Sequence, residues 1–185
     1  MALTPNDWTT AAGKLMADKG VSAVKVEVLA RELGVSKGSF YWHFKNRGEL
    51  LSAVIERWEI ETDWLIEEAN KADSPHKRWT RLFQLIAEIG GNESSIDIAM
   101  FLWAKEDDQI MERVKIVEQK RVGYIQELIE GAGFSPEEAS HRAEIAYLSF
   151  TGYVGRAGRD DAYLDIEKFR TFGAFLIELL LHKEV

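Results

Sequence analysis

Apolar residues recur along this chain at intervals of three and four positions, which is the period of an amphipathic α-helix. Near the N-terminus one such face comprises Trp8, Ala11, Ala12, Leu15 and Met16. A longer stretch after Asn46 carries a second face, comprising Leu50, Leu51, Val54, Trp58, Leu65 and Ala69. No stretch alternates apolar and polar residues as half-buried strands do. The pattern therefore predicts an all-α fold.

Prolines, hydroxyl side chains and glycines mark the ends of the predicted helices. Each of the three prolines follows Thr or Ser, at Thr4-Pro5, Ser74-Pro75 and Ser135-Pro136. A hydroxyl at the N-cap accepts a hydrogen bond from a free backbone N–H, and Pro at the next position lacks the N–H that would otherwise stay unpaired. The main glycine breaks are Gly90-Gly91, Gly131 to Gly133 and Gly155 to Asp161. We predict about nine helices, over residues 5–19, 26–33, 37–44, 46–71, 75–90, 95–105, 108–131, 136–156 and 165–182.

Residues 26–44 have the spacing of a helix-turn-helix. Ala30 is small at the point where two helices would cross, and Gly34 can adopt the positive φ that a tight turn requires. Phe40 and Phe44 then share one inward face of the second helix. A helical hairpin with a glycine turn also occurs in proteins that bind no DNA, so the spacing alone leaves both interpretations open.

The run GVSKGSFYWHFKNRGEL, residues 34–50, is preceded by a helix about 20 residues upstream. It resembles the TetR family of bacterial transcriptional repressors, in which Gly-Val-Ser, Tyr-x-His-Phe and Lys-Asn-Lys/Arg close the DNA-binding domain. The motif match covers about residues 8–51, and beyond residue 70 only the helical layout is similar. The resemblance implies a three-helix DNA-binding domain over residues 1–48 and an effector-binding and dimerisation domain over residues 49–185.

The resemblance also implies which residues face DNA, namely Lys25, Glu27, Ser36, Lys37, Gly38, Ser39, Tyr41, Trp42, His43 and Arg47. In the family, positions matching 37–39 approach base edges, and positions matching 41–43 touch phosphates or thymine methyl groups. Arg47 would clamp a phosphate at the start of the long helix. Glu27 can accept a hydrogen bond from cytosine, or it is an ordinary helix-start carboxylate. Tyr41 and Trp42 have packing as their alternative role.

The uneven distribution of charge is consistent with an N-terminal segment that faces nucleic acid, joined to an acidic body that comprises the rest of the chain. The chain has a net charge of −8, but residues 1–50 carry seven Lys or Arg against five Asp or Glu. Residues 51–185 carry 16 basic residues against 26 acidic ones. The first segment is therefore +2 and the remainder −10, which favours double-stranded DNA as a partner of the first segment.

Composition argues against an enzyme and against a membrane protein. The chain has no cysteine, which excludes disulfides, thiol catalysis and thiolate metal sites. Its four histidines are scattered, and no phosphate-binding glycine loop or metal-ligand motif is present, so we expect no cofactor and no metal. No apolar run approaches the roughly 18 to 20 residues of a membrane span, and no signal peptide begins the chain. We therefore expect a cytoplasmic protein with no membrane partner.

The acidic body is rich in aromatic residues, which can enclose an apolar cavity. The family resemblance implies a small-molecule effector in such a cavity, and the residues present favour an apolar or aromatic one. Our candidates for ligand contact are Trp103, Phe83 and Tyr147, because each lies in the middle of a predicted helix. The alternative is that these aromatic side chains are ordinary core residues.

The last two predicted helices have the features of a dimer surface. Residues 136–156 carry small side chains at Ala139, Ala143, Ala146, Ser149 and Gly152. The final helix carries Phe169, Phe172, Phe175, Leu176, Leu179 and Leu180. The resemblance implies that these helices pair with those of a second copy, while the alternative is burial within one chain.

The combined prediction is a transcriptional regulator, a repressor released from a palindromic operator by a ligand. The alternative is a helical interaction or ligand-binding module that does not bind DNA.

Overall fold

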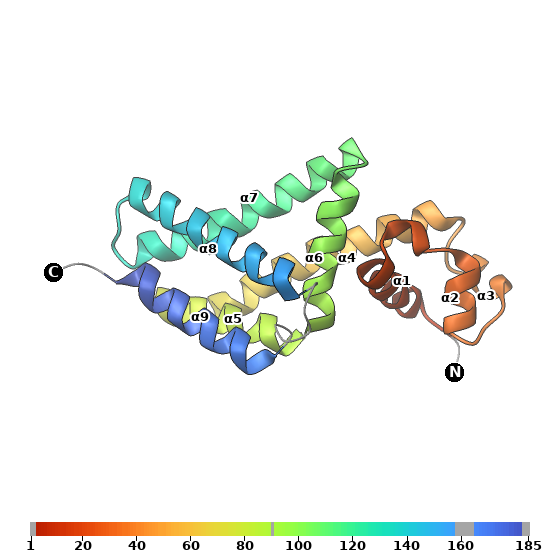
Figure 1. Cartoon of the computed structure of the whole chain (residues 1–185), viewed down its shortest axis with the longest axis horizontal. Coiled ribbons are helices and arrows are strands. Elements are labelled where there is room, and N and C mark those ends of the chain that lie inside the picture. The colour runs from red at the N-terminus through yellow and green to blue at the C-terminus, as the bar shows by residue number, and fades with distance from the viewer. Residues whose placement is uncertain (1–2, 90, 158–164, 183–185) are drawn as a thin grey trace.

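The computed structural model describes residues 3–89, 91–157 and 165–182, and for residues 91–95 and 157 it describes the backbone alone. Within these ranges every regular element is a helix, so the all-α prediction is confirmed (Figure 1). The elements are α1 (Pro5–Lys19), the 3₁₀ helix η1 (Val21–Ala23), α2 (Val26–Glu32), α3 (Lys37–Tyr41), α4 (Arg47–Asn70), α5 (Pro75–Ile89), α6 (Gly91–Ala104), α7 (Asp108–Gly131), α8 (Pro136–Ala157) and α9 (Ile166–Leu181).

The predicted caps form in the structure. The backbone N–H of Thr4 donates to Asp7 over 2.7 Å, and the N–H of Asp7 donates to the Thr4 hydroxyl over 3.3 Å. Asn46 caps α4 by accepting a hydrogen bond from the N–H of Glu49 at 3.0 Å. Gly34 has a φ of 68°, which allows the chain to turn between α2 and α3. These short-range contacts explain why the starts of α1 and α4 were predictable.

The helix ends differ from the prediction at several places. The helix α3 ends at Tyr41 rather than at residue 44, although the N–H groups of His43 and Phe44 still donate to the carbonyl of Phe40. The backbone thus tightens into a final turn instead of continuing the α-helix. The helix η1 was not predicted, and α6 begins at Gly91 rather than near residue 95. The predicted breaks at Gly90 and within 158–161 lie outside the described residues.

Two apolar clusters hold the helices together. The first joins α1–α3 to α4, α6 and the first half of α7, with Trp8, Phe40, Trp58 and Met100 almost fully buried in it. The second joins α5, α8, α9 and the second half of α7. Figure 1 shows α4 running from the N-terminal head into the body, with α6 standing between the two. The core of the head therefore continues past residue 48 into the body.

None of the helices in the described ranges is both long enough and apolar enough to cross a membrane.

Candidate nucleic-acid interface and ligand pocket

The helix α3 buries one side and exposes large aromatic side chains on the other. Phe40 is fully buried, with its ring centroid 5.3 Å from that of Trp8 and 5.6 Å from that of Phe44. In contrast, Tyr41 is 60% exposed and Trp42 is 87% exposed. These exposures rule out core packing as the role of the two residues. A Trp side chain left this open to solvent is uncommon unless the surface meets a partner.

Most of the other residues predicted to face DNA are exposed as well. Lys25, Ser36, Lys37 and Gly38 are exposed, and Ser39 and His43 are half-buried. Ser36 stands at the N-cap position of α3, but its side chain makes no capping hydrogen bond. The hydroxyl of Ser36 is therefore not engaged in holding the helix start.

Lys37 and Glu27 form an ion pair between α3 and α2. The Lys37 Nζ donates to Glu27 Oε1 over 2.7 Å, and this hydrogen bond lowers the pKa of the Glu27 carboxyl. Both side chains are more than half exposed, so the pair contributes little to stability. Its effect is to hold the Lys37 ammonium group beside the start of α2. Glu27 is thus a partner of Lys37 rather than an isolated helix-start carboxylate.

The structure gives Arg47 a role different from the predicted phosphate contact. Its Nε donates to the carbonyl of Val24 and its Nη2 to the carbonyl of Val21, each over 2.5 Å. The half-buried guanidinium therefore fastens η1 and the start of α2 to the start of α4. Sequence reasoning missed this because the two acceptor carbonyls lie 23 and 26 residues earlier in the chain.

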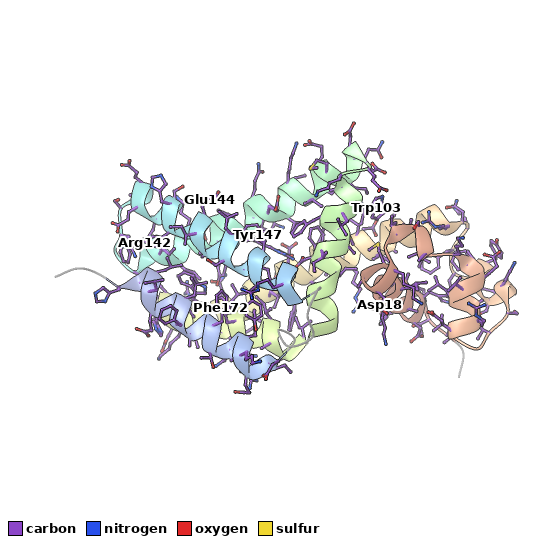
Figure 2. All side chains as sticks on the ribbon, in the orientation of Figure 1. Asp18, Trp103, Arg142, Glu144, Tyr147 and Phe172 are labelled. Carbon is purple, nitrogen blue, oxygen red and sulfur yellow. The ribbon has the colours of Figure 1, made fainter. Side chains whose placement is uncertain are left out.

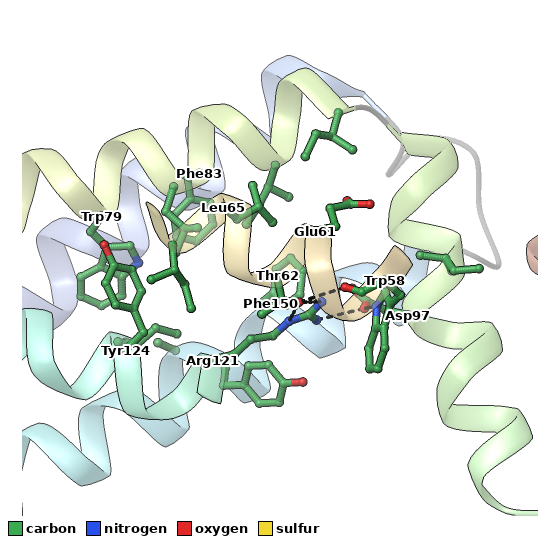
Figure 3. Close-up of a pocket in the computed structure, with 18 residues that line it drawn as sticks. Trp58, Glu61, Thr62, Leu65, Trp79, Phe83, Asp97, Arg121, Tyr124 and Phe150 are labelled. Atoms are coloured by element: carbon green, nitrogen blue, oxygen red, sulfur yellow. Dashed lines mark hydrogen bonds and ion pairs between the residues drawn. The ribbon is translucent and has the colours of Figure 1, made fainter. Parts of the chain in front are cut away.

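A cavity of about 90 Å³ lies in the body between α4, α5, α6, α7 and α8 (Figure 3). Phe83 and Tyr147, two of the three predicted ligand residues, line it. Much of the remaining wall is apolar, including Leu65, Trp79, Ile86, Ile125 and Phe150. Cavities that hold drug-sized ligands measure about 300–1,000 Å³, so this one fits a small ligand or must widen.

Trp103, the third predicted ligand residue, does not line this cavity. It is half-buried and packs against the first apolar cluster, near the head (Figure 2). The positions of α6 that face the cavity are Ile96 and Asp97. Trp103 follows Asp97 by six residues, or about 9 Å along a helix axis, and so lies beyond the cavity. Ligand contact at Trp103 is therefore not supported by this cavity and stays a prediction.

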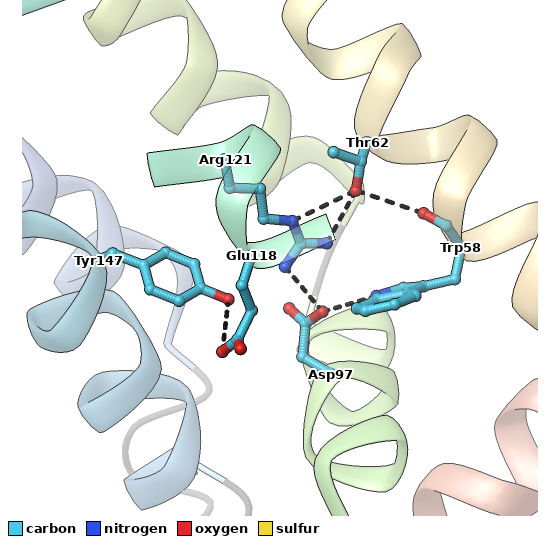
Figure 4. Close-up of polar contacts among 6 residues, drawn as sticks. All are labelled: Trp58, Thr62, Asp97, Glu118, Arg121 and Tyr147. Atoms are coloured by element: carbon cyan, nitrogen blue, oxygen red, sulfur yellow. Dashed lines mark hydrogen bonds and ion pairs between the residues drawn. The ribbon is translucent and has the colours of Figure 1, made fainter. Parts of the chain in front are cut away.

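A buried polar cluster closes one end of the cavity (Figure 4). Arg121 Nη1 donates to Asp97 over 2.9 Å, and the Trp58 Nε1 donates to the same oxygen over 2.7 Å. Arg121 also donates to the Thr62 hydroxyl from Nε at 3.2 Å and from Nη2 at 3.0 Å. Burial disfavours the charged guanidinium, but the interactions of Arg121 with Asp97 and Tyr147 together outweigh this and raise its pKa. Arg121 therefore stays positively charged.

Sequence reasoning did not identify Arg121 or Asp97. The two residues lie 24 positions apart on different helices, so no local spacing relates them. One signal was present, because Asp97 interrupts the apolar run from Ile96 to Trp103. A carboxylate inside such a run is expected to have a buried partner.

A sequence model described as "Bacterial regulatory proteins, tetR family" matches residues 9–54, which span α1, α2, α3 and the start of α4. Residues 9–54 therefore match the TetR family in sequence. The Tetracycline repressor protein class A from transposon 1721 of Escherichia coli is 41% identical over 54 residues, covering 29% of this chain and 25% of that protein. The regulator AcrR of Shigella flexneri is 36% identical over 47 residues, covering 25% of this chain and 20% of AcrR. The chain thus matches only a fifth to a quarter of the length of these curated relatives.

Beyond the head, the likeness is to the TetR fold. A transcriptional regulator from Rhodococcus sp. Rha1 has a TM-score of 0.77 at 17% identity, covering 97% of this chain and 96% of that one. The FadR regulator of Bacillus subtilis, solved in complex with stearoyl-CoA, has a TM-score of 0.71 at 13% identity, covering 98% of this chain and 100% of that one. The whole chain therefore has the fold of TetR-family regulators.

The residues that α8 and α9 expose agree only in part with the predicted set, with which they share Gly152, Phe175 and Leu179. Ala139, Ala143 and Ala146 are buried within the chain, because they lie on the side of α8 that packs into the second cluster. Phe169, Leu176 and Leu180 of α9 are buried in the same cluster, and Phe172 is half-buried. The exposed apolar side chains of these helices are Ile145, Leu148, Ile166, Phe175 and Leu179.

Proposed function

We propose that the chain is a cytoplasmic transcriptional repressor that binds a palindromic operator as a homodimer and is released by a small, mostly apolar ligand. The observation that carries the DNA-binding part is the exposure of Tyr41 and Trp42 at the end of α3, in a segment that also exposes Lys37 and that matches the TetR family. The name of the tetracycline repressor relative supports repression. The stearoyl-CoA in the FadR structure supports a ligand in the body.

In this proposal α3 enters the major groove and α2 lies across the backbone. Lys37 reads a base edge, while Gly38 and Ser39 let the backbone approach the bases closely. Tyr41, Trp42 and His43 contact phosphates or thymine methyl groups, and Lys25 and Ser36 contact phosphates. Glu27 keeps Lys37 extended across the start of α2 until a base replaces the carboxylate as its partner.

The dimer would form through the exposed faces of α8 and α9. Ile145 and Leu148 on α8 are 50% and 64% exposed, and Phe175 and Leu179 on α9 are 68% and 55% exposed. Apolar side chains grouped on two neighbouring helices favour association with a matching face. A dimer is also needed because one short recognition helix reads too few base pairs to select an operator.

Two helices connect the pocket to the head. The helix α4 packs Leu51 and Val54 in the first cluster and presents Thr62 and Leu65 to the cavity. The helix α6 presents Asp97 to the cavity and packs in the same cluster as α1. A ligand that widens the cavity would move both helices and change the separation of the two recognition helices. Typical couplings of this kind are about 1–3 kcal/mol, or roughly 5- to 150-fold in DNA affinity.

Selection of bound fragments from genomic DNA tests this proposal. Wild-type protein should enrich fragments that share an inverted repeat, with half-sites about 34–36 Å apart. Lys37→Ala should change base preference at one position of each half-site by about 1–3 kcal/mol. Lys120→Ala is the matched control, because Lys120 is also an exposed lysine paired with a carboxylate, Asp63, but lies on α7 in the body. Enrichment of no fragment, or equal effects of the two substitutions, would refute the proposal.

A further inference from the structure

The polar cluster in the cavity has hydrogen-bonding groups left over. Both hydrogen bonds of Asp97 to the described residues end on Oδ1, so Oδ2 has no partner among them. Asp97 is only 6% exposed and borders the cavity. A guanidinium has five N–H donors, and Arg121 uses three of them on Asp97 and Thr62. A further side-chain hydrogen bond joins Arg121 to Tyr147. One acceptor and one donor therefore remain beside the cavity.

These leftover groups belong to a pair whose charges already cancel. Arg121 and Asp97 are in contact, with side-chain exposures of 17% and 9%. A carboxylate on a ligand would compete with Asp97 for the same guanidinium and would leave one anion without a partner. An ammonium group would place a second positive charge beside Arg121. Glu61, the other charged residue on the wall, already has an interaction of its own. Either ion would therefore lose its hydration without gaining a full counter-charge.

The rest of the chemistry near Arg121 is uncharged or already paired. The Tyr147 hydroxyl lies 3.4 Å from Glu118 Oε1, and burial raises the pKa of Tyr147, so the phenol stays neutral. Thr62 accepts from Arg121 and donates to the carbonyl of Trp58 at 3.3 Å. Among the described residues beside the cavity, the Asp97–Arg121 pair is therefore the polar feature that still has an unpaired acceptor and an unpaired donor.

We infer that the cavity selects an uncharged ligand with an apolar or aromatic body and, at its polar end, a hydrogen-bond acceptor next to a donor, as in a carboxamide. The acceptor takes a hydrogen bond from Arg121, and the donor gives one to Asp97 Oδ2. The inference rests on the proposed function only in treating the cavity as the effector site. The cavity volume of about 90 Å³ restricts the first probes to single-ring compounds.

Four probes that share a phenyl ring test this selection: benzamide, benzoate, benzylammonium and toluene. Their dissociation constants for the wild-type chain are measured by calorimetric titration without DNA. Benzamide should bind about tenfold more tightly than each of the other three, because it alone can use both leftover groups without adding a charge. Equal or tighter binding of benzoate or benzylammonium, or no binding of benzamide, would overturn the inference.

Two variants locate the selection at Asp97. Asp97→Asn keeps the shape of the side chain but leaves Arg121 without its counter-charge, so this variant should bind benzoate more tightly than benzamide. Tyr124→Phe is the control, since it removes a hydroxyl that borders the same cavity but donates to Asn70 at 3.1 Å. It should keep the wild-type order. An unchanged preference for benzamide in folded Asp97→Asn protein would also overturn the inference.

The outcomes separate this inference from the proposed function. A chain that binds its operator but prefers benzoate contradicts only the selection of uncharged ligands. A chain that prefers benzamide but selects no DNA contradicts only the proposed repressor.

Discussion

Replacement of Asp97 by Ala should destabilise the folded chain by several kcal/mol. The substitution removes the acceptor that Arg121 reaches over 2.9 Å and Trp58 over 2.7 Å. Arg121, whose side chain is only 17% exposed, then keeps its charge without a carboxylate partner. Loss of one member of a buried ion pair costs about 3–5 kcal/mol. Because Thr62 still accepts from Arg121, we expect a value of about 3 kcal/mol, at the lower end of that range.

Thermal and urea unfolding at one fixed protein concentration measure this cost, since association makes apparent stability depend on concentration. For a chain of this size, a loss of about 3 kcal/mol lowers the melting temperature by roughly 6–12 °C. The double variant Asp97→Ala/Arg121→Met removes both charges and should be more stable than Asp97→Ala alone. A cost below about 1 kcal/mol for Asp97→Ala, or simple additivity in the double variant, would refute the argument that the pair is coupled.

Three further substitutions test other parts of the account. Gly173→Ala should lower the free energy of unfolding by about 1–2 kcal/mol, because its Cβ would clash with the Phe83 ring and the gain in helix propensity offsets only part of the clash. The same variant should weaken benzamide binding in calorimetry. Arg47→Ala should cost about 2 kcal/mol of stability but leave the salt dependence of DNA binding unchanged, whereas loss of a phosphate contact would reduce that slope by about one. Phe175→Arg should convert the dimer to a monomer in light scattering, while Ile60→Arg, at an equally exposed position on α4, should not.

The features that could be predicted from the sequence depend on short-range physics. Helix starts at Pro5 and Arg47 follow from capping side chains within three residues of the helix. The exposure of Trp42 follows from its place opposite Phe40 and Phe44 in α3 and the turn that follows it. The surface proposed to face DNA was therefore recognisable before the structure.

The features that could not be predicted depend on how helices cross. Periodicity identified an apolar or small-residue face on α8, but it did not say whether Ala143 meets the same chain or a second copy. Trp103 has the same mid-helix setting as Phe83, and only the crossing of α6 with α1 and α7 separates it from the cavity. The Asp97–Arg121 pair likewise exists only because α6 and α7 meet at that point.

Competition between two duplexes tests whether the protein binds DNA in a sequence-specific manner. Fluorescence anisotropy measures the affinity for the selected operator and for a duplex of the same composition in scrambled order, at several salt concentrations. The account predicts that the operator binds at least about 10³-fold more tightly and that both affinities fall steeply as salt rises. Equal affinity for the two duplexes, or affinity that does not change with salt, would contradict it.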